Sequence, residues 1–166
     1  YMAGTVRIGF AGTDARTLLS ALTVSTARSK GSDAEFKGVV IRGTSAMPKF
    51  AQKDIMDWDV EFVSTADNSA ESYAAAIVQA LENGAVDYVV PMPEGLIFSG
   101  IVDMVAESGM ADRVAGFTKA GAFIEGDKIA CKKFCREGGI PVADQWDVVD
   151  AKSYPDVLSV CLAYIH

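Results

Sequence analysis

Residues 6–14 of the chain read VRIGFAGTD. The first five residues form a short apolar run, and Gly12, Thr13 and Asp14 follow as a turn-like segment. The next stretch, Ala15 to Arg28, carries leucine and valine at close to helical spacing. A strand, a glycine-containing turn and a helix in this order are the first half of a βαβ unit. The start of the chain therefore predicts an α/β protein with a parallel sheet.

The same alternation continues toward the C-terminus. Further strands are predicted at 36–41, 60–63, 87–90 and, briefly, 114–116, with helices at 70–82, 97–107, 119–124 and 127–137. Residues 43–57 are predicted as a loop, 142–149 as extended chain and 153–165 as a helix. The nearly continuous apolar character of 87–90 is typical of a strand buried on both faces. We expect a doubly wound parallel sheet in residues 1–117 and an appended second part in 118–166, too small to bury a core alone.

Composition limits the classes of protein that are possible. The 166 residues include 15 Lys+Arg and 22 Asp+Glu, for a net charge of −7, and half are apolar. This excess of acid argues against binding to nucleic acid, and the apolar content argues against disorder. No apolar run is long enough to span a membrane, and no signal peptide is apparent. Three cysteines do not suit a disulfide framework. We therefore expect a cytoplasmic protein, and the absence of a stop signal near His166 predicts a truncated chain.

The first candidate site is the turn at Gly12, Thr13 and Asp14. Backbone N–H groups at a helix N-terminus favour anions, so the amides near Gly12 and Thr13 are candidates for holding a phosphate. The glycine spacing of a dinucleotide site is missing, and so is that of a P-loop. The alternative is that Asp14 simply caps the helix, and the sequence leaves both interpretations open.

The second candidate is Pro91-Met92-Pro93-Glu94, where another strand ends. Two prolines stiffen the backbone there, so Glu94 projects from a rigid loop and can accept hydrogen bonds from sugar hydroxyls. The alternative is that Glu94 serves only the start of the next helix. The rigidity of the loop favours a binding role for Pro93 and Glu94.

The third candidate is Lys128, in the segment Glu125-Gly126-Asp127-Lys128. Asp127 is a suitable N-cap, whereas a lysine in the first helical turn opposes the helix dipole. A bound nucleotide phosphate would compensate it, and a solvated lysine is the alternative. Cys131 and Cys135 share a helix face, but a metal site would need two further ligands, so we expect core or boundary thiols.

Two of these segments resemble the phosphoribosylamine–glycine ligase family of ATP-grasp enzymes. The family pattern V-V-G-P-E-x-P-L, followed by V-x-G-I-V-D, is similar to VVPMPEGL at 89–96 and SGIVD at 99–103. A longer pattern, G-P-[ST]-K-A-A-A-x-[LI]-E-G-[SD]-K-x-x-[AC]-K, is similar to GFTKAGAFIEGDKIACK at 116–132, and G-I-P recurs at 139–141. The resemblance covers residues 5–166 and is strongest from 87 to 141.

The resemblance implies a Rossmann-like domain at 1–117, then linker helices and the truncated beginning of an ATP-grasp domain at 118–166. It implies a ligase that joins glycine to 5-phosphoribosylamine in purine biosynthesis through a glycyl phosphate. ATP and magnesium would be held mainly by a later part of such an enzyme, so this chain alone is expected to be inactive and to hold no metal. Lys128 would reach the ATP phosphates and Glu94 the ribose, with Gly12, Thr13 and Asp14 beside the substrate.

The chain departs from the family at both substrate loops. Thr13-Asp14-Ala15 stands where the family has R-E-H, and Met92 replaces a glycine. The alternatives are therefore another ATP-grasp carboxylate–amine ligase, a biotin-dependent carboxylase and a formate-using transformylase. A non-catalytic α/β binding module is a further one. A receiver domain is disfavoured because the third long strand ends in Val90-Pro91 rather than in an aspartate.

Overall fold

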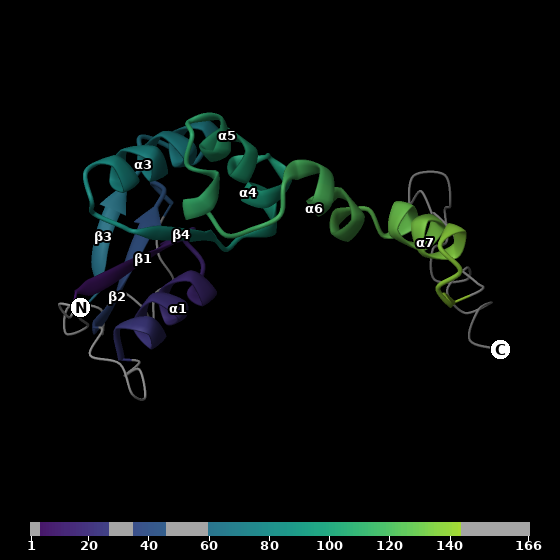
Figure 1. Ribbon diagram of the computed structural model, residues 1–166, viewed down its shortest axis with the longest axis horizontal. Helices are drawn as coiled ribbons and strands as arrows, with labels where there is room; N and C mark the ends of the chain where they lie inside the picture. Colours follow the sequence, from purple (N-terminus) through teal and green to yellow (C-terminus); the bar gives the residue numbers. More distant parts are fainter. Residues whose placement is uncertain (1–3, 27–34, 46–59, 144–166) are drawn as a thin grey trace, which may run out of the picture. The chain divides into compact units, whose positions relative to one another are not determined.

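The computed structural model describes residues 4–26, 35–45 and 60–143, which are coloured in Figure 1. The predictions for 46–57, 144–149 and 153–165 lie outside these residues. The chain forms two compact units, Tyr1–Lys128 and Ile129–His166, and each is described by itself. The predicted boundary at residue 117 stays a prediction.

The first unit is built on a sheet of four parallel strands. They are β1 (Thr5–Ala11), β2 (Glu35–Arg42), β3 (Glu61–Ser64) and β4 (Tyr88–Pro91), in the spatial order β3-β2-β1-β4. Gly9 in β1 pairs with Val39 on one side and with Val89 on the other. Helix α1 (Ala15–Thr26) connects β1 to β2, and α3 (Ala70–Glu82) precedes β4 (Figure 1). The predicted parallel α/β sheet is confirmed, and its direction of winding reverses between β1 and β4.

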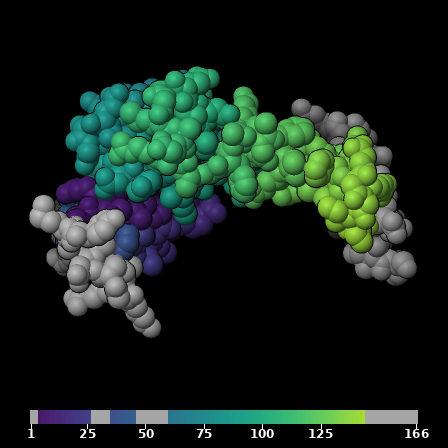
Figure 2. All heavy atoms as spheres, in the orientation of Figure 1, coloured from purple at the N-terminus to yellow at the C-terminus, as the bar shows by residue number. Residues whose placement is uncertain are grey.

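Two apolar clusters lie on opposite faces of the sheet. One joins the sheet to α3, α4 (Glu94–Phe98) and α5 (Ile101–Glu107), with fully buried Ile41, Ile77 and Ile101. In the space-filling view the teal atoms of α3 adjoin the green atoms of α5 (Figure 2). The other cluster joins Phe10 and Val40 of the sheet to α1. Burial on both faces explains the consecutive buried residues at 9–11 in β1 and 38–41 in β2, whereas β3 alternates between half-buried and exposed positions.

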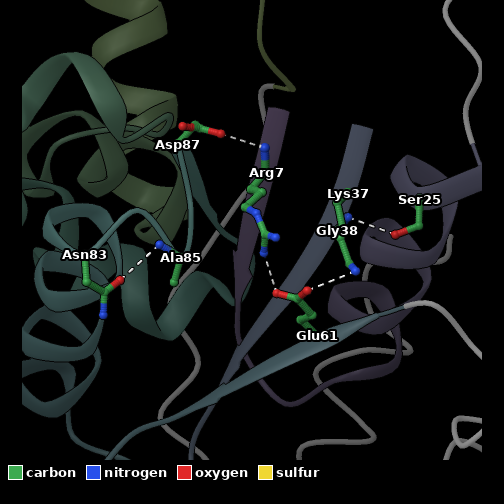
Figure 3. A network of polar contacts seen from close by, with 8 residues as sticks. All are labelled: Arg7, Ser25, Lys37, Gly38, Glu61, Asn83, Ala85 and Asp87. Carbon is green, nitrogen blue, oxygen red and sulfur yellow. Dashed lines mark hydrogen bonds and ion pairs between the residues drawn. The ribbon is translucent and has the colours of Figure 1, made fainter. Parts of the chain in front are cut away.

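A group of charged residues joins the strands away from their carboxyl ends. Glu61 of β3 bridges Arg7 of β1 at 2.5 Å and Lys37 of β2 at 2.9 Å (Figure 3). The hydrogen bond from Lys37 and, next, that from Arg7 outweigh the effect of burial and lower the pKa of Glu61. The Arg7 amide also donates to Asp87, at 2.8 Å. The two ion pairs connect β3 to β2 and, across β2, to β1, and because they are partly exposed each contributes little stability.

The structure divides the helix predicted at 97–107. Helix α4 begins earlier, at Glu94, and α5 starts only at Ile101, because Gly100 between them has φ = 86°. A left-handed residue of this kind ends a helix and turns the chain. The strand predicted at 114–116 is reduced to a single bridge between Val114 and Val89.

Two helices follow, α6 (Lys119–Gly126) and α7 (Lys128–Glu137). Thr118 caps α6 by accepting the Gly121 N–H at 3.2 Å, and α6 packs against α4 and α5. Asp127, predicted as the N-cap of the next helix, directly precedes α7, and its own N–H donates to the Phe123 carbonyl and closes the end of α6. Among the described helices, none is both long and apolar enough to cross a membrane.

Candidate functional site

The candidate site lies where β1 and β4 end side by side. The Met92 amide donates to the Ala11 carbonyl at 3.0 Å, and the Gly12 amide donates to the Ile41 carbonyl at 2.9 Å. A methyl group added at Gly12 would lie only 2.8 Å from the Pro93 ring, so the two loops are in contact. The structure therefore brings the predicted loops 12–14 and 93–94 together. In doubly wound sheets this is the place where ligands bind.

Asp14 occupies the N-terminus of α1 with its own carboxylate. One carboxylate oxygen accepts the Thr17 amide at 2.8 Å and the Thr17 hydroxyl at 2.6 Å, and the other is 3.0 Å from the Arg16 guanidinium. Burial acts to raise the pKa of Asp14, but the Thr17 hydrogen bonds and the Arg16 contacts together hold it below its ordinary value. Of the two interpretations of Asp14, the structure gives the helix cap.

This cap has an electrostatic consequence for the predicted phosphate site. The N–H groups and positive dipole end of a helix attract one negative group, and the Asp14 carboxylate already serves α1 in that way. A phosphate bound at the same amides would lie close to this carboxylate and would be repelled by its negative charge. The loop is thus better suited to a group that donates hydrogen bonds, such as a hydroxyl or an amine.

Sequence reasoning missed one residue beside these loops, Tyr73. Its buried hydroxyl, from α3, accepts the Gly43 amide at 2.7 Å. Burial raises the pKa of Tyr73 against the lowering effect of the Gly43 bond. Asn68 accepts the Ser45 amide at 3.2 Å in the same loop after β2. Tyr73 therefore ties the loop after β2 to α3, whereas helical periodicity alone predicts it only as a core residue.

Glu94 is the first residue of α4, and Pro93 before it adopts an extended backbone with no side-chain cap. The Glu94 side chain is exposed, and within the described part of the chain no hydrogen bond or ion pair holds it. Its negative charge stabilises the helix N-terminus, which is the simpler of the two predicted roles. Its exposure beside the contact between Pro93 and Gly12 also leaves it available to a ligand.

Lys128 has a partner that the sequence argument did not foresee. Its ammonium group donates to the carbonyl of Glu125 at 2.8 Å, in the last turn of α6. A cation at a helix C-terminus is favourable, so this contact compensates the position of Lys128 without a bound anion. The predicted contact of Lys128 with ATP stays a prediction.

Two hollows lie near these residues. A groove of about 610 Å³ beside α1 is lined by Phe10, Leu19 and Met92, with Arg16 at its polar side. A smaller hollow of about 250 Å³ lies between Phe98 and Phe123, next to Lys119 and Asp127. Among the described residues, no group of three or more His, Cys, Asp or Glu is placed to hold a metal ion.

Comparisons with known proteins agree with the motifs and the topology. A phosphoribosylamine–glycine ligase from Rhodopirellula baltica is 35% identical over 69 residues, which are 42% of this chain and 15% of the ligase. A biotin carboxylase domain of a single-chain bacterial carboxylase superimposes with a TM-score of 0.51 at 16% identity, covering 96% of this chain and 34% of that one. No family model matches the chain. The chain thus spans a minor part of both proteins. The predicted resemblance to the ligase is confirmed, and so is the Rossmann-like parallel α/β fold.

Proposed function

We propose that this chain is the substrate-side part of an ATP-dependent carbon–nitrogen ligase that joins glycine to 5-phosphoribosylamine through a glycyl phosphate. The observation that carries the proposal is the 35% identity with a ligase of that name. The parallel sheet supports it, because its reversal of winding brings the loops at Gly12 and Pro93 into contact. The whole reaction then also requires the part of the ligase that this chain does not span.

In this proposal the crevice binds the sugar amine. Glu94 projects from a proline-stiffened strand end and accepts hydrogen bonds from the ribose hydroxyls. Asp14 keeps the α1 N-terminus occupied, so Gly12 and Thr13 face the hydroxyl or amine part of the substrate, and its phosphate is directed elsewhere. Two carboxylates on loops in contact also favour an amine over an anion.

ATP and magnesium belong to the later part of the ligase. When bound, they would supply the phosphoryl group and neutralise its charge. The described residues hold no cluster of three or more acidic, histidine or cysteine side chains for the metal. Lys128 is the residue of this chain that we propose for the ATP phosphates, for which it would have to leave the Glu125 carbonyl.

The substitution Glu94→Ala in the ligase that contains this chain tests the assignment. Loss of a charge-assisted hydrogen bond costs on the order of 1.5–3 kcal/mol, or roughly 10- to 100-fold in the KM for the sugar amine, with the KM for ATP unchanged. The measurement is steady-state ADP release with each substrate varied. Glu107→Ala is the matched control, because Glu107 is also an exposed glutamate of a short helix, at the end of α5. A damaged KM for ATP with an intact KM for the amine would contradict the proposal.

A ligase that acts on a different amine is the second candidate, and Asp14 is the observation that favours it. Thr13-Asp14-Ala15 replaces the family's R-E-H, and the structure shows a carboxylate fixed at that place. Ribosylamines with and without the phosphate, assayed for glycine-dependent ADP release, separate the two candidates. The same assay applied to the 166-residue chain checks the prediction that it is inactive alone.

A further inference from the structure

Two cysteines on α7 lie together outside the site already described. Cys131 and Cys135 are four residues apart, so they occupy the same face of the helix one turn apart. Both side chains are partly buried, and neither is in a disulfide. Burial and the neighbouring Cys131 raise the pKa of the Cys135 thiol. The sequence predicted core or boundary thiols, and the partial burial of both side chains is that of boundary positions.

The spacing of the pair favours a bridging ion over a direct bond. Residues four apart on a helix have Cβ atoms about 5–6 Å apart, whereas a disulfide needs about 3.5–4.5 Å. Direct oxidation would therefore distort α7. An ion bound to both sulfurs spans the larger distance, because each metal–sulfur bond adds about 2.3 Å.

The number of ligands restricts which ion is suitable. Structural zinc takes four protein ligands, but the described residues hold no third histidine, cysteine or acid grouped with these two thiols. Soft thiolates select Cu(I), an ion that two sulfurs can satisfy in a linear arrangement. When it binds, the two thiols release their protons to the buffer and no electron is transferred, which leaves a complex of charge −1. Lys132, Lys133 and Arg136 on the same helix favour that charge.

We propose that Cys131 and Cys135 form a two-thiolate site for a soft monovalent ion, Cu(I). The site needs only the helical spacing of α7 and the adjacency of its two sulfurs. It is independent of the ligase reaction, whose proposed residues lie in the first unit.

Competition for Cu(I) tests the proposal on the 166-residue chain. The protein is titrated without oxygen against the coloured Cu(I) complex of bathocuproine disulfonate. One Cu(I) is expected per chain, and Cys131→Ser or Cys135→Ser should each weaken its binding on the order of 100-fold, because a chelating partner is lost. The third cysteine provides the matched control, and Cys161→Ser should bind as tightly as the parent.

The remaining outcomes decide against the site. Either single variant binding as tightly as the parent, with the parent's circular dichroism spectrum, overturns the proposal. So does an equal loss in Cys161→Ser, which would show that Cu(I) uses a different pair. Serine is suited to both α7 positions because neither thiol is fully buried, so unfolding is not expected to obscure the result.

Discussion

The contact of α1 with the sheet depends on the absence of a side chain at Gly38. A methyl group placed there would lie 2.0 Å from the carbonyl oxygen of Ala21 and 2.5 Å from its carbonyl carbon. Both atoms are backbone, so no rotamer change relieves the overlap. Ordinary contact begins near 3.4 Å, so α1 or β2 must recede by about 1.4 Å. Such a shift opens the cluster around fully buried Leu18 and strains the bond from the Gly38 amide to Ser25 (Figure 3).

Gly38→Ala is therefore expected to destabilise the chain. Overpacking typically costs roughly 1–3 kcal/mol, and because backbone must move here we expect about 3–4 kcal/mol, just above that range. Replacing a glycine within a strand recovers about 1 kcal/mol of backbone entropy, so the free energy of unfolding should fall by about 2–3 kcal/mol. Urea unfolding followed by circular dichroism measures it. Gly95→Ala is the control, because nothing lies within 4 Å of its added methyl group, and it should not destabilise. An unchanged urea midpoint for Gly38→Ala would refute the argument.

Two further substitutions test the loops of the candidate site. Asp14→Ala removes the cap of α1 and should cost about 1–2 kcal/mol at neutral pH. Because the pKa of Asp14 is lowered on folding, its contribution is complete above its unfolded pKa and is lost as the pH falls through its lower folded pKa. The difference between parent and variant in urea titrations should therefore be smaller near pH 3 than at neutral pH, and an equal difference at both pH values would contradict this. Tyr73→Phe leaves the buried Gly43 amide without its acceptor and should cost about 1–3 kcal/mol, whereas Tyr88→Phe, at an exposed tyrosine, should change unfolding by less than about 0.5 kcal/mol. Equal effects of the two substitutions would show that the Tyr73 hydroxyl is not important.

Helices and strands with a clear hydrophobic pattern, and with capping or terminating residues at their ends, could be predicted from the sequence. Helix α3 has the predicted bounds, 70–82, because Ser69 caps its start and Asn83 ends it. The strands were recognisable as apolar runs, and in β1 and β2 the residues at 9–11 and 38–41 are buried without alternation because both faces of the sheet are covered there. The break at Gly100 was not recognisable, because the apolar pattern continues across it and only the left-handed backbone of that residue separates α4 from α5.

The site was harder to predict because its residues act on groups outside their own segments. Asp14 had two possible roles, and the Thr17 amide and hydroxyl decided between them. The sequence argument considered the charge of Lys128 only in relation to the dipole of the helix that it begins. Its partner is instead a carbonyl in the last turn of the preceding helix. The sequence could not predict that Tyr73 holds a loop, because its hydroxyl accepts the Gly43 amide only where the loop after β2 meets α3.

The central position of β1 also governs the order in which the molecule can be built. Ile8 pairs with Gly38 on one side but with Tyr88 on the other, so the second pairing closes a much longer loop of chain. Non-local parallel pairing of this kind slows folding. On the ribosome β1 emerges first, and one of its edges stays without a partner until β4 has been synthesised. A nascent chain that stalls before Tyr88 thus exposes a bare row of backbone donors and acceptors to its neighbours, and aggregation competes with folding during that interval.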